Sequence, residues 1–67
     1  MYVDINKQEL KKRMALKGYN IKEFAQACGL NVGTISLLLN KEKRKVTPKT
    51  LLIFAEVLGV DAETLIQ

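Results

Sequence analysis

Residues 20–40, NIKEFAQACGLNVGTISLLLN, contain two short amphipathic segments joined at Gly29. Asn20 and Asn31 precede these segments, and asparagine is a favoured residue at the N-cap of a helix. We therefore expect helices over residues 21–28 and 32–39. Glycine can reverse the chain through a positive φ angle, so the turn between the helices needs only about three residues. This spacing is typical of a helix-turn-helix unit.

The same start signal recurs at five points along the chain. At each point an apolar residue precedes a capping residue, and a second apolar residue follows at the fourth helical position, as in a hydrophobic staple. The capping residues are Asn6, Asn20, Asn31, Thr47 and Asp61. They predict helices over residues 7–17, 21–28, 32–39, 48–58 and 62–66. A glycine, which closes a helix in the left-handed conformation, follows three of these ranges at Gly18, Gly29 and Gly59.

No strand-like alternation of apolar and polar residues competes with this helical pattern. The sequence therefore predicts an all-α fold, a compact bundle of five helices in which the second and third form the helix-turn-helix. With 67 residues, 48% of them hydrophobic, the chain has the size of one small domain over residues 1–67. Residues 1–5 precede the first cap, and we expect them to form a flexible arm.

One cysteine, Cys28, cannot form an internal disulfide, so we expect a reducing compartment, the cytoplasm. Cys28 falls on the apolar side of its helix and is expected to pack in the core rather than to react or bind a metal. No apolar run reaches the roughly 20 residues of a membrane span, and the N-terminus lacks a signal-peptide pattern. We therefore expect no membrane association.

Charge is divided unevenly along the chain. Residues 1–49 hold all 11 Lys and Arg against four acidic residues, a balance of +7, whereas residues 50–67 hold three acidic residues and no basic ones, a balance of −3. A concentration of positive charge in the helix-turn-helix half is expected of a protein with a polyanionic partner. The alternative is an ordinary solvated, lysine-rich surface.

Residue types that carry catalysis are missing. The chain has no histidine, no glycine-rich phosphate loop and no cysteine cluster, so we expect no enzyme, no metal and no cofactor. The five helices use the whole chain, and we therefore also expect no small-molecule ligand.

Short motifs along residues 10–66 occur in a recognisable order. They include Lys17-Gly18-Tyr19-Asn20, Glu23-Phe24-Ala25, Gly29-Leu30-Asn31, Thr34-Ile35-Ser36 and Leu58-Gly59-Val60. In these motifs and in its five-helix pattern, the chain resembles the Cro/CI-type (XRE-type) helix-turn-helix domains of phage and bacterial regulators, which are lambda-repressor-like.

The resemblance implies that the helix over 32–39 inserts into the major groove of double-stranded DNA. It also implies a transcriptional regulator, a repressor of the phage or mobile-element type, in the bacterial cytoplasm or nucleoid. Such a regulator binds a palindromic operator as a homodimer, which forms in solution or only on DNA. We expect the dimer surface around Val57, Leu65 and Ile66.

By family position, the residues that face the groove lie at the start and on the outer side of the 32–39 helix: Asn31, Val32, Gly33, Thr34, Ser36 and Leu37. None is Arg or Gln, the types suited to bidentate base contacts. Val32 and Leu37 are instead expected to meet thymine methyl groups, and Ser36 or Asn31 to bind a base or phosphate. Leu37 has a second interpretation, because it begins an apolar run that a protein partner would cover. On that interpretation, the chain is a protein-interaction module of the same fold.

Six residues are candidates for contacts with DNA phosphates: Lys17, Lys22, Asn40, Lys43, Arg44 and Lys45. The segment after the 32–39 helix touches the phosphates in relatives, and each neutralised phosphate releases counterions. Each lysine has the alternative of being an ordinary surface residue.

The chain departs from the family pattern at four positions. Met14 and Leu39 stand where many members carry an arginine and a glutamate that pair with each other. Because both positions are apolar here, no unpaired charge is left, and we predict that the Met14 and Leu39 side chains touch. Ile21 stands where relatives commonly have a glutamine that contacts phosphate, which puts that contact in doubt. Lys41 stands where the family often has glycine after this helix, and Asn40 is expected to take the left-handed turn instead.

Overall fold

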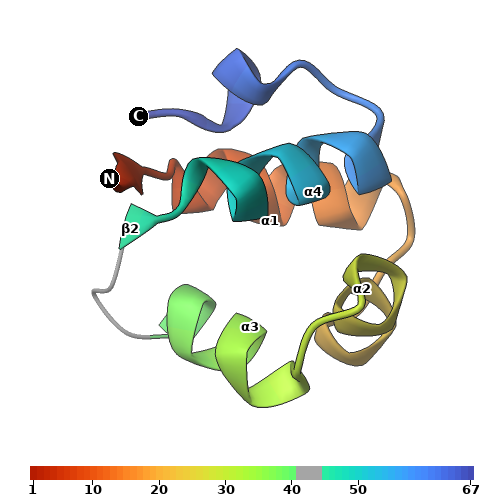
Figure 1. Cartoon of the computed structure of the whole chain (residues 1–67). Helices are drawn as coiled ribbons and strands as arrows, with labels where there is room; N and C mark the ends of the chain where they lie inside the picture. Colours follow the sequence, from red (N-terminus) through yellow and green to blue (C-terminus); the bar gives the residue numbers. More distant parts are fainter. Residues whose placement is uncertain (41–44) are drawn as a thin grey trace.

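The structure is a computed structural model that describes residues 1–40 and 45–67 (Figure 1). Four α-helices account for most of it: α1 (Lys7–Leu16), α2 (Ile21–Cys28), α3 (Val32–Asn40) and α4 (Pro48–Leu58). A 3₁₀ helix, η1 (Ala62–Leu65), follows α4, and two short strands, β1 (Val3–Asp4) and β2 (Lys45–Val46), complete the described elements. In Figure 1, α2 and α3 lie together at one end, α1 and α4 cross the middle, and η1 lies at the opposite end.

The helix starts follow the predicted caps. The Asn6 side chain accepts a hydrogen bond from the Glu9 N–H at 3.1 Å, and the Thr47 hydroxyl accepts one from the Thr50 N–H at 3.2 Å. Such bonds satisfy amides that have no partner inside the helix. Asp61 occupies the N-cap position of the last helix as predicted, but its side chain makes no capping hydrogen bond.

The all-α, five-helix prediction needs two corrections. The fifth predicted helix is the four-residue 3₁₀ helix Ala62–Leu65, not an α-helix over 62–66. In addition, β1 and β2 form an antiparallel pair in which Val3 opposes Val46 and Asp4 opposes Lys45. This pairing joins segments that are far apart in the sequence, so no local pattern could reveal it.

Residues 3–5 are part of the fold rather than of the expected flexible arm. Ile5 is fully buried and forms an isolated β-bridge with Ile66. The Gln67 N–H donates to the Asp4 carbonyl oxygen at 3.1 Å. Strand β1 therefore lies between β2 and the last two residues of the chain.

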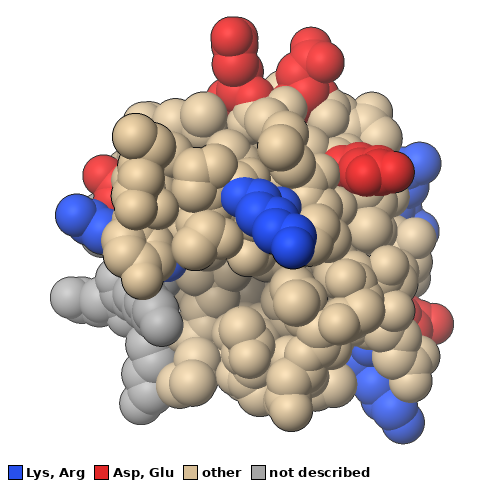
Figure 2. Space-filling model, viewed as in Figure 1, with Lys and Arg blue, Asp and Glu red and all other residues tan. Residues whose placement is uncertain are grey.

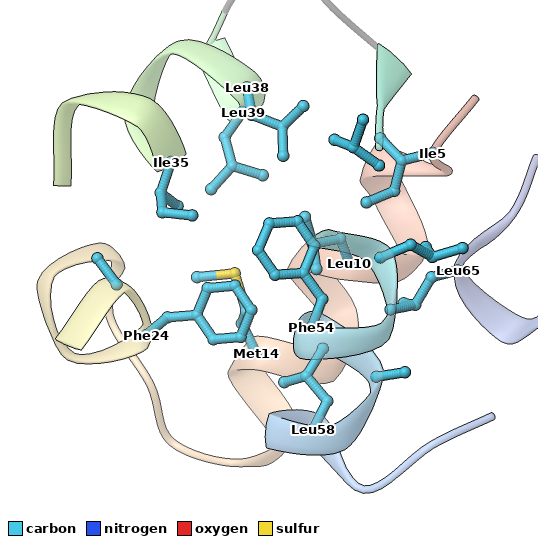
Figure 3. Packing of buried hydrophobic residues seen from close by; sticks show 14 residues of the cluster. Ile5, Leu10, Met14, Phe24, Ile35, Leu38, Leu39, Phe54, Leu58 and Leu65 are labelled. Atoms are coloured by element: carbon cyan, nitrogen blue, oxygen red, sulfur yellow. The ribbon is translucent and has the colours of Figure 1, made fainter. Parts of the chain in front are cut away.

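The core lies where the four α-helices, β2 and η1 meet (Figure 3). Phe24 of α2 and Phe54 of α4 pack against each other in a tilted arrangement, with ring centroids 5.3 Å apart. Leu65 is fully buried in this core, so it is not available to the dimer surface expected around Val57, Leu65 and Ile66. Cys28 packs against the core while half-buried, and burial raises the pKa of its thiol to about 11.

Candidate functional site

Helices α2 and α3 form a unit with a fixed turn. Asn20 and Glu23 make a reciprocal capping box at the start of α2, with the Glu23 N–H donating to the Asn20 side chain at 2.7 Å. At the end of α2, Gly29 adopts the predicted left-handed conformation with a φ of 71°. The Leu30 N–H then donates to the Ala25 carbonyl oxygen at 2.9 Å, which closes the turn. The chain thus enters α3 after only residues 29–31, as the helix-turn-helix interpretation predicts.

Helix α3 has one buried and one exposed side. Ile35, Leu38 and Leu39 face the core. On the other side, Val32 is 42% exposed and Leu37 is 54% exposed. Gly33, Thr34 and Asn40 are also exposed, and Ser36 is half-buried. The helix has no charged residue, so its outer side presents apolar groups and uncharged polar groups to a partner.

Asn31 and Gly33 are linked at the start of α3. The Asn31 Oδ1 accepts a hydrogen bond from the Gly33 N–H at 2.7 Å. A Cβ atom on residue 33 would lie 3.0 Å from that same oxygen, which is a tight approach. A glycine at position 33 therefore makes room for the Asn31 side chain.

Asn40 belongs to α3, and its side-chain Nδ2 donates to the Ser36 Oγ at 3.1 Å. The expectation that Asn40 takes a left-handed turn is wrong, because only glycines have a positive φ among the described residues. The helical hydrogen-bond pattern continues through Asn40, one turn beyond Ser36.

A hollow of about 670 Å³ separates the outer side of α3 from α1 and the start of α2. Met14 and Leu39, both buried, line it, so the structure brings these two residues to one surface; their direct contact stays a prediction. Val32, Ser36 and Asn40 line its α3 side.

Two lysines also line this hollow, Lys22 from α2 and Lys11 from α1. Sequence reasoning selected Lys22 and missed Lys11. No local signal distinguishes Lys11 from its neighbours in α1, because tertiary packing alone brings that face of α1 beside α3.

A second hollow lies on the far side of α3, toward β2 and α4. Leu37 and Thr34 line it together with Tyr2 and Lys45. Tyr2 is a second residue that the sequence did not single out, because residues 1–5 were expected to form a separate arm. Lys45 is exposed in β2, beside this hollow.

The remaining phosphate candidates differ in position. The Lys17 Nζ lies 3.6 Å from where a Cβ on Gly59 would sit, which places this ammonium group at the C-terminal end of α4. A cation there is favourable beside the negative end of the helix dipole, which supports a structural role for Lys17. Lys43 and Arg44 lie outside the described residues.

Three acidic residues lie in the C-terminal part of the chain, away from α2 and α3. Acidic side chains protrude at the top of Figure 2, over the C-terminal segment, whereas the part of this view over α2 and α3 is mostly uncharged. Glu56, Asp61 and Glu63 are the exposed acidic residues of the C-terminal part. Helix α3 itself carries no charged residue, so a polyanion would meet no repulsion from the side chains of that helix.

Within residues 1–40 and 45–67, no group of His, Cys, Asp or Glu side chains is arranged to hold a metal ion.

None of the helices in the described part of the chain is both long enough and apolar enough to cross a membrane.

Comparisons with known proteins agree with this geometry. The model of the family described as the Cro/C1-type HTH DNA-binding domain matches residues 9–67. Among solved structures, a mutant of hydroxyethylphosphonate dioxygenase is similar, with a TM-score of 0.79 and 23% sequence identity. This similarity covers 96% of the present chain and 14% of that one, so it shows a shared fold alone. No curated protein sequence matches the chain.

Proposed function

The chain belongs to the family of Cro/C1-type HTH DNA-binding domains, and from this premise we propose that it binds double-stranded DNA in a sequence-specific manner, with α3 in the major groove. We further propose that it regulates transcription in a bacterial cytoplasm or nucleoid, as a phage- or mobile-element-type repressor that binds a palindromic operator as a homodimer. The family is defined by DNA binding and not by a catalysed reaction, in agreement with the expectation that the chain is not an enzyme.

The observation that carries the proposal is the exposed outer side of α3. Val32 and Leu37 are large apolar side chains that a soluble helix normally turns inward, yet they point outward while Ile35, Leu38 and Leu39 fill the core. The major groove admits an α-helix and presents methyl groups and hydrogen-bonding atoms to it. Lys22 and Lys45 flank this side in positions suited to the DNA backbone.

In vitro selection from a random duplex library tests the proposal. The selected sequence should be a palindrome with half-site centres about 34 Å apart, as expected for a dimer that uses two copies of α3. Its affinity should exceed that of a scrambled duplex, and both affinities should fall as salt rises. Failure to enrich any sequence would contradict sequence-specific binding.

A second candidate function is a protein-interaction module. The same apolar exposure that suits thymine methyl groups also suits a protein partner, and α3 offers no charged residue of its own to a nucleic acid. Weak binding to all duplexes, together with a protein captured by the wild type and lost on Leu37→Ala, would favour this alternative.

A further inference from the structure

The hollow between α1, the start of α2 and α3 has the size and lining of a small-molecule site. Its volume of about 670 Å³ lies within the range of such sites, about 300–1,000 Å³, which also occur between the helices of bundles. Apolar side chains from three helices line it, Met14 from α1, Ile21 from α2 and Leu39 from α3. The sequence predicts no small-molecule ligand because the predicted helices use the whole chain, but this hollow needs no additional segment.

The charged residues that line this hollow all have the same sign. Lys11 of α1 and Lys22 of α2 are exposed residues on its wall, and none of its described lining residues is acidic. Within residues 1–40 and 45–67, neither lysine forms an ion pair. An anionic group in the hollow would therefore be attracted by two positive charges without displacing an existing partner of either. Apolar walls with two such cations complement an amphipathic anion, a molecule with an apolar body and one negatively charged group.

We propose that this hollow binds a small amphipathic organic anion, such as a medium-chain carboxylate. The carboxylate lies beside Lys11 and Lys22, and the hydrocarbon part covers the apolar surface formed by Met14, Ile21 and Leu39. Removal of hydrocarbon from water supplies most of the affinity. The two exposed charge pairs add a smaller share that decreases as salt rises.

Occupation of the hollow opposes binding of DNA. Val32, Ser36 and Asn40 form the α3 wall of the hollow, and Val32 is on the exposed side of α3 that the proposed function places in the major groove. Lys22, the expected phosphate contact, is the residue that the carboxylate would engage. A bound anion therefore adds negative charge and bulk where the DNA backbone would approach. This consequence rests on the proposed function, whereas binding of the anion itself does not.

Octanoate and 1-octanol provide the test, because they share a hydrocarbon chain but only octanoate is charged. The dissociation constant of each is measured from chemical-shift changes in ¹H–¹⁵N spectra of the whole chain. Octanoate should bind about fivefold more tightly than octanol, the value of two exposed charge pairs, and the shifts should concentrate on the lining of the hollow. In the double variant Lys11→Gln, Lys22→Gln, the two dissociation constants should become equal.

Ala15→Glu tests the location of the anion, because Ala15 is an exposed residue of α1 that lines the hollow. A carboxylate at this position should weaken binding of octanoate by at least about fivefold through repulsion and lost space. Ala27→Glu is the matched control, since it adds the same charge to an exposed alanine of α2 that does not line the hollow. This variant should keep the wild-type affinity for octanoate, and circular dichroism checks that each variant is folded.

The duplex selected in vitro tests the effect on DNA. Octanoate at about ten times its dissociation constant should weaken binding of this duplex to the wild type by about tenfold, as expected for two ligands that exclude each other. Acetate at the same concentration is the control for ionic strength. In Ala15→Glu, octanoate should weaken the duplex no more than acetate does.

The possible failures are distinguishable. Equal affinities of the wild type for octanoate and octanol, or no binding of octanoate, would overturn the proposed anion site. Unchanged affinity for octanoate in Ala15→Glu would place the anion elsewhere and would also overturn it. Bound octanoate that leaves the duplex affinity unchanged would overturn the competition with DNA. Absence of any selective duplex, together with octanoate bound in this hollow, would overturn the proposed function and support the anion site.

Discussion

The side chain of Asn31 and the backbone of Gly33 form one unit: the Asn31 Oδ1 accepts the Gly33 N–H at 2.7 Å and lies 3.0 Å from the place that a Cβ on residue 33 would occupy. The cap at the start of α3 and the choice of glycine two residues later are thus linked. The first prediction follows from this link.

Asn31→Ala should lower the free energy of unfolding by about 1 kcal/mol, the usual value of a lost N-terminal cap. In the Gly33→Ala background the same change should cost less, because the new Cβ already displaces the Asn31 oxygen. Gly33→Ala alone should change stability little, since the better helix propensity of alanine offsets the weakened cap. Urea denaturation of the four proteins measures this coupling, and strictly additive effects would show that the two residues act independently.

Met14 and Leu39 are the subject of the second prediction. Both are buried and line one hollow. Each single change to alanine should destabilise the fold by about 2 kcal/mol or more. If the side chains touch, the double variant should depart from additivity by at least about 0.5 kcal/mol, whereas an additive cycle would reject the contact.

Lys22 is expected to contact a phosphate. Lys22→Gln should weaken binding to selected and scrambled duplexes alike, and should reduce the slope of log affinity against log salt by about 1. Lys12→Gln is the control, because Lys12 is exposed on α1 but does not line the hollow beside α3. Equal slopes for Lys22→Gln and the wild type would mean that Lys22 is an ordinary surface residue.

The thiol of Cys28 should react slowly near neutral pH. Burial raises its pKa from 9.0 to about 11, and the thiolate is the reactive form. In the folded protein, the rate of alkylation by iodoacetamide should therefore increase with pH up to about 11. In urea, where the chain is unfolded, the same increase should occur near pH 9. The folded state favours the protonated thiol, so its contribution to stability should decline as the pH rises from about 9 to about 11. Cys28→Ser should remove this dependence of stability on pH. An alkylation rate that levels off near pH 9 in the folded protein would contradict a raised pKa of the thiol.

Local chemistry explains what the sequence could predict. The boundaries of α1 to α4 follow from asparagine and threonine caps, from Pro48 in the first turn of α4 and from left-handed glycines, each of which acts within a few residues. The buried and exposed sides of α3 follow from helical periodicity. These elements were predicted to within one residue at each end.

Long-range packing explains the features that the sequence could not predict. Three features depend on segments that meet only in the folded chain. They are the pairing of β1 with β2, the place of Ile5 in the core and the position of Lys11 beside α3. Tyr2 was missed for the same reason. At Asp61 the local pattern predicts more than the structure contains. Aspartate is a favoured capping residue, but at the start of this short 3₁₀ helix its side chain makes no capping hydrogen bond.

The position of β1 also bears on how the fold closes. Residues 4–6 are bonded to residues 65–67 through the Ile5–Ile66 bridge, the Asn6 N–H to the Leu65 oxygen and the Gln67 N–H to the Asp4 oxygen. A chain that lacks residues 65–67 offers Ile5 and Asn6 no partner for these bonds, so the native topology closes only when both ends of this small fold are present.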